Sequence, residues 1–139
     1  MATTTAQITL TSTDIADNAL SISNTMTLTT AGTETGITET TGLARKKIAS
    51  ASLADLITVA NTDVTAAKSA KVYIKNTSTA TDKYGLVGIG DSSGTPIYIG
   101  RLYGGDWMLI PWDANSGEDI TMTMNDSTET IIEYMVFFE

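Results

Sequence analysis

Short segments in which apolar and polar residues alternate recur along this chain of 139 residues, and few folds accommodate that pattern. Lys71–Asn76 (KVYIKN) and Ile120–Met124 (ITMTM) are clear examples. A period of two places successive side chains on opposite faces of a β-strand. Between such segments the chain is rich in Gly, Ser, Asn and Asp, which favour turns. The pattern therefore predicts short antiparallel strands joined by turns.

Strand signals dominate the second half of the sequence. They predict strands in residues 71–76, 84–89, 95–103, 107–112, 120–124 and 130–138, with loops or turns at 76–83, 90–94 and 113–119. About seven or eight strands at intervals of about 8–14 residues are typical of an antiparallel β-sandwich or a jelly roll. The predicted fold class is therefore all-β, with residues 43–139 forming a β-sandwich domain.

One short segment favours a helix instead. Ser52–Asp55 (SLAD) resembles a helix N-cap followed by an acidic residue at the third helical position. Leu53, Leu56 and Ile57 would share one face of that helix. Because β-branched residues follow at positions 58 and 59, we expect only one or two helical turns.

Residues 1–42 differ from the rest in composition, because fifteen of them are threonine. Apolar residues alternate with polar ones at Ile8 and Leu10 and then fall on even positions at Leu20, Ile22, Met26 and Leu28. This period predicts strands with one buried face, whereas three glycines in residues 31–42 predict a long loop. We interpret residues 1–42 as an extended Thr-rich arm or as edge strands. Their low apolar content makes a disordered tail the alternative.

The formal net charge of −8 is distributed unevenly. Residues 1–44 hold four acidic and no basic residues, and residues 102–139 hold eight acidic and no basic residues. All eight Lys and Arg lie in residues 45–101, together with four acidic residues. DNA would be repelled overall, so we expect no nucleic-acid partner. A basic middle between acidic ends suits contacts with protein surfaces, including other copies of the chain.

Histidine and cysteine are both absent. Their absence removes the commonest general base, the thiol nucleophile and the imidazole and thiolate ligands of metals. We therefore predict no enzyme activity and no cofactor. No apolar run reaches the ~18 residues of a membrane helix, and the N-terminus lacks the pattern of a signal peptide. We expect a chain made in the cytoplasm without a membrane partner.

The loop Asp113–Asp119 (DANSGED) places oxygen-bearing side chains at alternate positions, as calcium loops do. It departs from the EF-hand pattern at Glu118 and Met124, where a glycine and a bidentate acid belong. A polar turn accounts for the same residues, and we assign no metal site.

Both tryptophans of the chain, Trp107 and Trp112, lie in one predicted strand that follows a Gly-Gly-Asp turn. Asp106 and Asp113 flank them, which is compatible with carbohydrate binding or a glycosidase. One position is odd and the other even, so the two indoles point to opposite faces of the strand. We expect one to pack in the core and the other to anchor an outer surface.

The segment TIIEYMVFF (residues 130–138) is apolar on both faces except at Glu133. Ile132, Tyr134, Val136 and Phe138 share one face, and Ile131, Met135 and Phe137 share the other. A sandwich covers only one face of each strand, so we expect the second face to meet another protein surface or the N-terminal arm. An exposed edge of this kind would aggregate, which predicts a central or interface strand.

The densest positive charge is the run Arg45-Lys46-Lys47. Most such runs form a solvated face, and docking to an acidic partner is the alternative. We take the predicted interface residues to be Arg45, Lys46, Lys47, Trp107, Trp112, Ile131, Met135 and Phe137.

From about Lys68 to Glu139 the chain resembles small virion structural proteins of tailed phages, especially those of marine cyanophages. The residues that carry the resemblance are Lys71–Thr79 (KVYIKNTST), Ile99–Trp112 (IGRLYGGDWMLIPW) and the short C-terminal strand. The resemblance implies a structural role without catalytic residues. It points to a capsid decoration (cement) protein on the virion surface.

A decoration protein would form a homo-oligomer and dock on the major capsid protein or on other virion proteins. A head–tail, tail or fibre subunit with the same fold is the second hypothesis. A carbohydrate-binding β-sandwich that uses Trp107 or Trp112 is the third.

Overall fold

The computed structural model describes residues 4–14, 19–27, 39–49, 52–59, 70–114 and 117–138. Within these ranges the chain forms eleven β-strands and no α-helix, which confirms the all-β prediction. The same ranges contain no helix with the length and hydrophobicity that crossing a membrane requires. The strands are β1 (Thr5–Ser12), β2 (Leu20–Thr27), β3 (Glu39–Thr40), β4 (Ala44–Ile48), β5 (Ala54–Ile57), β6 (Ala70–Asn76), β7 (Tyr84–Ile89), β8 (Ile97–Tyr103), β9 (Trp107–Trp112), β10 (Ile120–Met124) and β11 (Thr130–Phe138).

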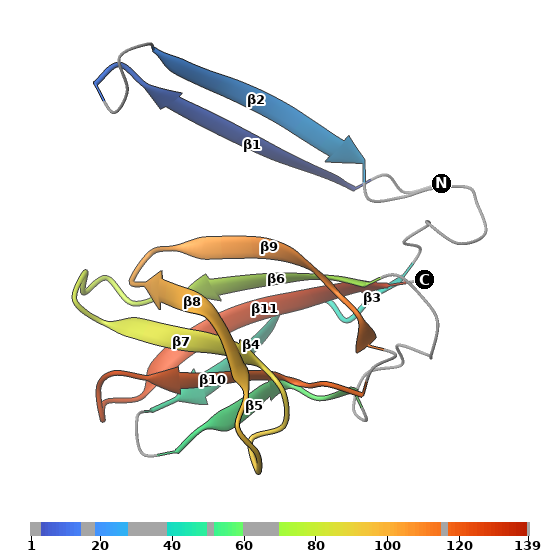
Figure 1. The fold of residues 1–139 in the computed structure, drawn as a ribbon, viewed down its shortest axis with the longest axis vertical. Helices are drawn as coiled ribbons and strands as arrows, with labels where there is room; N and C mark the ends of the chain where they lie inside the picture. The colour runs from blue at the N-terminus through green and yellow to red at the C-terminus, as the bar shows by residue number, and fades with distance from the viewer. Residues whose placement is uncertain are drawn as a thin grey trace.

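Strands β3 to β11 form two sheets that pack face to face (Figure 1). One sheet has the order β5-β10-β7-β8, and the other has the order β3-β11-β6-β9 with β4 also paired to β11. Every pairing is antiparallel. The predicted antiparallel β-sandwich is therefore confirmed, and its jelly-roll form stays a prediction. The six strands predicted in the second half all form, with ends that differ by at most two residues.

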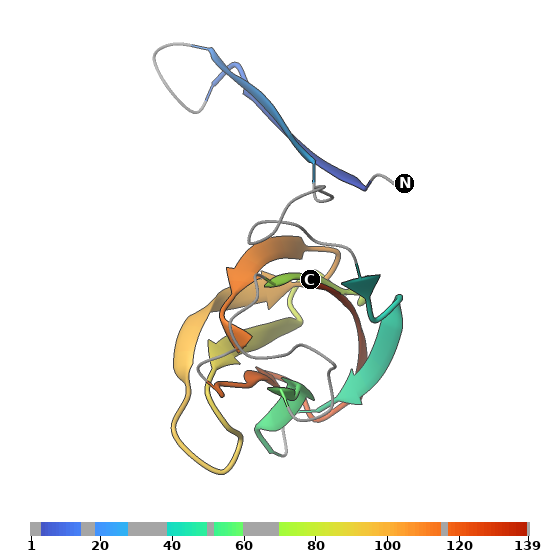
Figure 2. The same cartoon turned by 90° about the vertical axis from the view of Figure 1, so that its right-hand side faces the viewer.

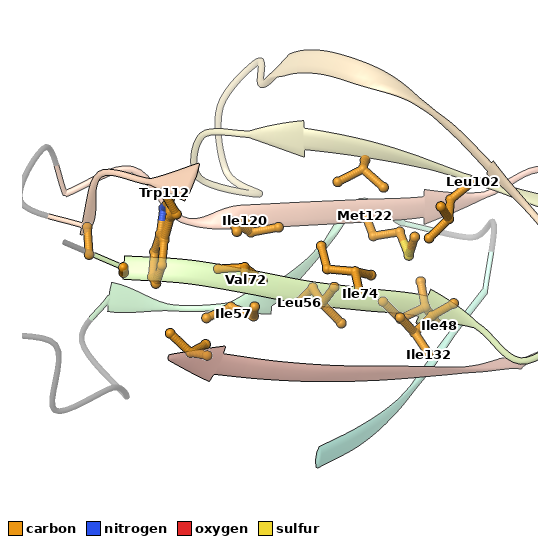
Figure 3. Packing of buried hydrophobic residues seen from close by; sticks show 14 of the residues in the cluster. Ile48, Leu56, Ile57, Val72, Ile74, Leu102, Trp112, Ile120, Met122 and Ile132 are labelled. Carbon is orange, nitrogen blue, oxygen red and sulfur yellow. The ribbon is translucent and has the colours of Figure 1, made fainter. Parts of the chain in front are cut away.

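Alternate side chains of these strands fill the space between the sheets (Figure 3). Val72 and Ile74 of β6 are fully buried, and Ile120 and Met122 of β10 are fully buried opposite them. Complete burial of one such side chain stabilises the fold by about 1.5–3 kcal/mol. The apolar residues that alternate in the sequence are therefore the ones whose side chains point into the core.

Strand β11 lies in the middle of its sheet, between β6 on one side and β3 and β4 on the other. Ile132, Val136 and Phe138 are buried in the core, whereas Met135 and Phe137 on the opposite face are only half-buried. Both the central position and the division into two faces agree with the sequence prediction. Only the even-numbered face of β11 packs in the sandwich.

The helix predicted from Ser52–Asp55 is wrong, because residues 54–57 form strand β5, which pairs with β10. Asp55 does not cap a helix. Its carboxylate accepts hydrogen bonds from the backbone N–H and the hydroxyl of Ser92, each 2.7 Å long. Leu56 and Ile57 are both buried in the sandwich. Burial and pairing with β10 therefore override the local capping signal.

The turn Gly104–Asp106 joins β8 to β9 and connects the two sheets. Gly105 has a φ of 88°, a conformation that favours glycine. A Cβ atom at Gly104 would collide with the carbonyl oxygen of Ala80. The carboxylate of Asp106 accepts a hydrogen bond from the backbone N–H of Tyr103 at 3.0 Å. Close approach, positive φ and a side-chain cap thus explain the sequence Gly-Gly-Asp.

Asn76 connects this turn to the loop 77–83. Its side chain is fully buried, donates to the carbonyl oxygen of Leu102 at 3.0 Å and accepts from the backbone N–H of Ser78 at 3.0 Å. Its backbone carbonyl accepts from Gly105 at 3.0 Å. Buried amides of this kind stabilise a fold only when they are hydrogen-bonded, and Asn76 is held on several sides.

Strands β1 and β2 form a separate two-stranded sheet that projects away from the sandwich (Figure 2). The strand character predicted for this part of the chain is confirmed, but no face of the pair is buried. Ile8 and Leu10 of β1 and Leu20, Ile22 and Met26 of β2 are all exposed. Leu28 lies outside the described residues.

The long loop predicted for residues 31–42 falls mostly outside the described residues. At its end, Glu39–Thr40 form strand β3, which pairs with Phe137 and Phe138 of β11. The loop prediction is wrong at these two positions. Thr41 continues the contact, because its N–H donates to the carbonyl of Val136 and its hydroxyl accepts from the N–H of Val136, both at 3.0 Å.

Candidate interaction surface

A groove of about 470 Å³ lies on the outer face of the sheet that contains β6, β9 and β11. We call it the outer groove. Its floor and sides are formed by Leu43, Tyr73, Lys75, Trp107, Leu109, Met135 and Phe137, and residues 4–7 at the start of the hairpin form one wall. Most of these side chains are apolar or aromatic. The groove therefore has the composition of a surface that binds an apolar partner.

The two tryptophans lie on opposite faces of β9, as their positions in the sequence predict. Trp112 is 4 % exposed in the core, and its indole N–H donates to the carbonyl oxygen of Glu118 at 3.0 Å. Trp107 is 50 % exposed in the outer groove, with its ring centroid 6.3 Å from that of Tyr73. Trp112 is therefore not accessible to a partner, although it was one of the predicted interface residues. Trp107 is accessible.

The remaining apolar residues predicted for the interface do not lie together. Met135 and Phe137 line the outer groove. Ile131 is 42 % exposed at the other end of β11, where it pairs with Lys47 of β4. The outer groove therefore accounts for Trp107, Met135 and Phe137, and Ile131 belongs to a neighbouring part of the same sheet face.

The basic run Arg45-Lys46-Lys47 lies in β4, where each cation contacts a group of the same chain. Arg45 donates from Nε and Nη2 to one oxygen of Glu133, at 2.9 and 2.7 Å. Lys47 forms an exposed ion pair of 3.1 Å with Glu129, and Lys46 donates to the backbone carbonyl of Asp55. Two of the three charges are thus paired with carboxylates, which reduces the field available to an acidic partner.

Two further cations lie beside the outer groove. Lys71 and Lys75 of β6 are in register with Phe137 and Glu133 of β11, and neither forms an ion pair with another described residue. Desolvation by burial, with a smaller contribution from the charge of Glu133, raises the pKa of Tyr73 between them. The groove thus combines an apolar floor with a positive rim.

The described part of the calcium-like loop is occupied by structural hydrogen bonds. A carboxylate oxygen of Asp119 accepts from the backbone N–H of Val59 at 2.8 Å, and the carbonyl of Asp119 accepts from Gly90 at 2.9 Å. Among the described residues no three His, Cys, Asp or Glu side chains gather as metal ligands would. The polar-turn interpretation accounts for these contacts.

The hairpin carries a second candidate surface, which the sequence suggested only in part. Register pairs Ala6 with Met26 and Leu10 with Ile22, so the apolar residues of both strands share one face, on which Asn24 lies opposite Ile8 and Ser12 opposite Leu20. We call this the apolar hairpin face; its apolar residues are Ala6, Ile8, Leu10, Leu20, Ile22 and Met26. The sequence shows the alternation in each strand, but only the pairing shows that the two apolar sets coincide.

Strand β8 forms the edge of its sheet and exposes large apolar residues that sequence reasoning assigned to an ordinary strand. Ile97, Tyr98 and Ile99 are 79 %, 47 % and 45 % exposed. Further along, Arg101 lies over the ring of Tyr84 at 4.6 Å from its centroid. A strand that packs on one face exposes every second residue, whereas β8 exposes three successive apolar residues. Consecutive exposed apolar residues in an edge strand mark a surface that can bind a partner.

Comparison with known proteins adds no relative, because no family model, no curated protein and no solved structure matches this chain significantly.

Proposed function

We propose that this chain is a structural, non-enzymatic subunit that acts by assembling with other protein surfaces. The observation that carries the proposal is the apolar hairpin face, which projects away from the sandwich and leaves its large apolar side chains exposed to solvent. A two-stranded hairpin has marginal stability by itself in water. Contact with another protein surface would bury the apolar side chains of the hairpin and stabilise it.

Within this class we propose a capsid decoration protein of a tailed phage. The resemblance of Lys71–Thr79 and Ile99–Trp112 to virion structural proteins supports this assignment. The structure supports it through two separate apolar surfaces, the outer groove and the edge strand β8. A decoration protein needs one surface for its own copies and one for the shell.

Copy number tests this proposal directly. Quantitative mass spectrometry of purified phage particles that encode this chain should find it in hundreds of copies per particle. A few to a few dozen copies would instead indicate a head–tail, tail or fibre subunit. Absence from purified particles would refute the virion function altogether.

Exposed Trp107 beside Tyr73 supports a second candidate, carbohydrate binding, because aromatic platforms bind sugar rings. Titration of tryptophan fluorescence with host polysaccharides tests it. A saturable change that is absent in Trp107→Ala would favour this candidate. No change at millimolar sugar would remove it.

A further inference from the structure

The hairpin and the outer groove each present apolar side chains that stay exposed within the described part of the chain. The apolar hairpin face is 37–47 % exposed at each of Ile8, Leu10, Leu20, Ile22 and Met26. The opposite face of the hairpin carries only threonine, serine and glutamine, at Thr5, Gln7, Thr9, Thr11, Ser21, Ser23, Thr25 and Thr27. One face of the hairpin is thus built for contact and the other for water.

We infer that the apolar hairpin face of one copy packs into the outer groove of a second copy, and that the exchange is reciprocal. The inference rests on the proposed assembly function and names one partner, the chain itself. The first residues of the hairpin, Ala6 among them, already line the groove in their own copy, yet the large apolar residues of the apolar hairpin face stay exposed to solvent. Both halves of the contact are therefore present on every copy.

Charge complementarity favours a second copy as the occupant. The hairpin, residues 5–27, contains two acidic residues, Asp14 and Asp17, both in the segment between its strands, and no basic ones. The sheet face that holds the outer groove carries Lys71 and Lys75, which form no ion pair with another described residue. The net negative charge in the segment between the hairpin strands and a basic rim attract each other, whereas two hairpins facing each other would bring like charges together.

The size of the contact also suits reciprocal exchange. Two strands of eight residues make a patch about 26 Å long and about 10 Å wide. Two such patches and their two receiving grooves together bury about 1,000 Å², which is near the lower limit for a specific interface. A single contact of this size would be too small, and symmetry supplies the second one.

Sedimentation equilibrium and tryptophan emission of the purified full chain provide the first test. We expect a monomer–dimer equilibrium, with an emission shift to shorter wavelength as the dimer forms, because the dimer covers Trp107. The shift should disappear in Trp107→Phe, where only buried Trp112 reports. A monomer at all concentrations would overturn the inference, and so would a dimer in which Trp107 stays exposed to water.

Matched substitutions locate the contact. Ile8→Asp on the apolar hairpin face and Met135→Asp in the outer groove should each raise the Kd of the dimer by about tenfold or more. Thr9→Asp, on the polar face of the same strand, should leave the Kd unchanged. Retention of the dimer in Met135→Asp, with loss in Ile8→Asp, would mean that the hairpin meets a different surface and would overturn the inference.

Cross-linking separates exchange between copies from docking within one copy. The chain contains no cysteine, so single-cysteine variants report on one position only. A mixture of Ile8→Cys and Leu109→Cys, treated with a short bifunctional thiol reagent, should form a covalent pair of the two variants. A mixture of Thr9→Cys and Leu109→Cys should not. A double variant that cross-links only within itself in dilute solution would overturn the exchange.

These results are independent of the virion test. A chain that is monomeric in solution but abundant in particles would refute the exchange and leave the proposed function in place. A dimer joined through the outer groove but absent from particles would refute the proposed virion function and leave the exchange in place.

Discussion

The β1–β2 hairpin and the β6–β11 pair have the same kind of sequence but differ in how far their apolar side chains are buried. Both are antiparallel pairs in which apolar residues recur with a period of two. In the β6–β11 pair, Val72, Ile74, Ile132 and Val136 are fully buried against the opposite sheet. In the hairpin every apolar residue of comparable size is more than a third exposed. Alternation thus specifies a strand and its contact face, whereas the surface that covers this face depends on distant segments or other molecules.

A charge on the inward face of β11 should have the largest effect on stability. Val136→Asp or Phe138→Asp should unfold the sandwich, at a cost of more than about 4 kcal/mol, because the carboxylate would be buried without a partner. Ile22→Asp, on the apolar hairpin face, should leave the fold intact. Met135→Asp and Phe137→Asp should remain folded but fail to assemble. Circular dichroism and size-exclusion chromatography separate these results, and unfolding of all the variants would show that both faces of β11 are core.

Replacement of an asparagine should have a smaller effect, which differs between the sandwich and the hairpin. Asn76→Ala should lower the free energy of unfolding by about 2–3 kcal/mol, because it leaves the buried carbonyl of Leu102 without its donor. Asn24→Ala, on the exposed hairpin, should change it by less than about 0.5 kcal/mol. Urea denaturation of both variants measures the difference. Equal effects would mean that the hairpin is as tightly packed as the sandwich.

Thr121 of β10 has a buried polar group, a feature that the exposed threonines of the hairpin do not share. Its hydroxyl is fully buried and has no hydrogen-bond partner among the residues that the structure describes. Thr121→Val should therefore raise the free energy of unfolding by about 1 kcal/mol. Thr9→Val on the exposed hairpin should leave it unchanged. A loss of stability in Thr121→Val would show that the hydroxyl has a partner in solution.

Removal of the hairpin should have the smallest effect on stability. Deletion of residues 1–38 retains β3 and the contacts of Thr41 with Val136. The free energy of unfolding of the truncated chain should lie within about 0.5 kcal/mol of that of the full chain. The truncated chain should no longer assemble. Thermal denaturation and binding to phage particles lacking the protein measure the two properties. Normal decoration by the truncated chain would refute the role of the hairpin as an arm.

Much of the sandwich could be predicted because its strands are local patterns. The parity of Trp107 and Trp112 was enough to assign one to the core and one to the surface. The helix wrongly predicted where β5 forms has the same origin, because it was inferred from a local pattern. Leu53, Leu56 and Ile57 fit a helical spacing, and nothing nearby in the sequence shows that β10 pairs with this segment.

The candidate surface was predicted less completely, because it depends on contacts between distant residues. Met135 and Phe137 could be identified from the two apolar faces of β11. The partners of Arg45 and Lys47, at Glu133 and Glu129, lie at the other end of the chain. Similarly, the amphipathic hairpin is visible only when Leu10 is known to pair with Ile22.

The central place of β11 has a consequence for how the protein is made. It is the last strand of the sandwich to leave the ribosome, yet β3, β4 and β6 all hydrogen-bond to it. Until it emerges, the two halves of its sheet have no strand to join them, and the nascent chain must keep its apolar segments apart from those of other chains. Folding that depends on such distant pairings is slow. Assembly of this sheet therefore waits for β11, because a chain that stops before β11 has no strand to hold β3 and β4 beside β6.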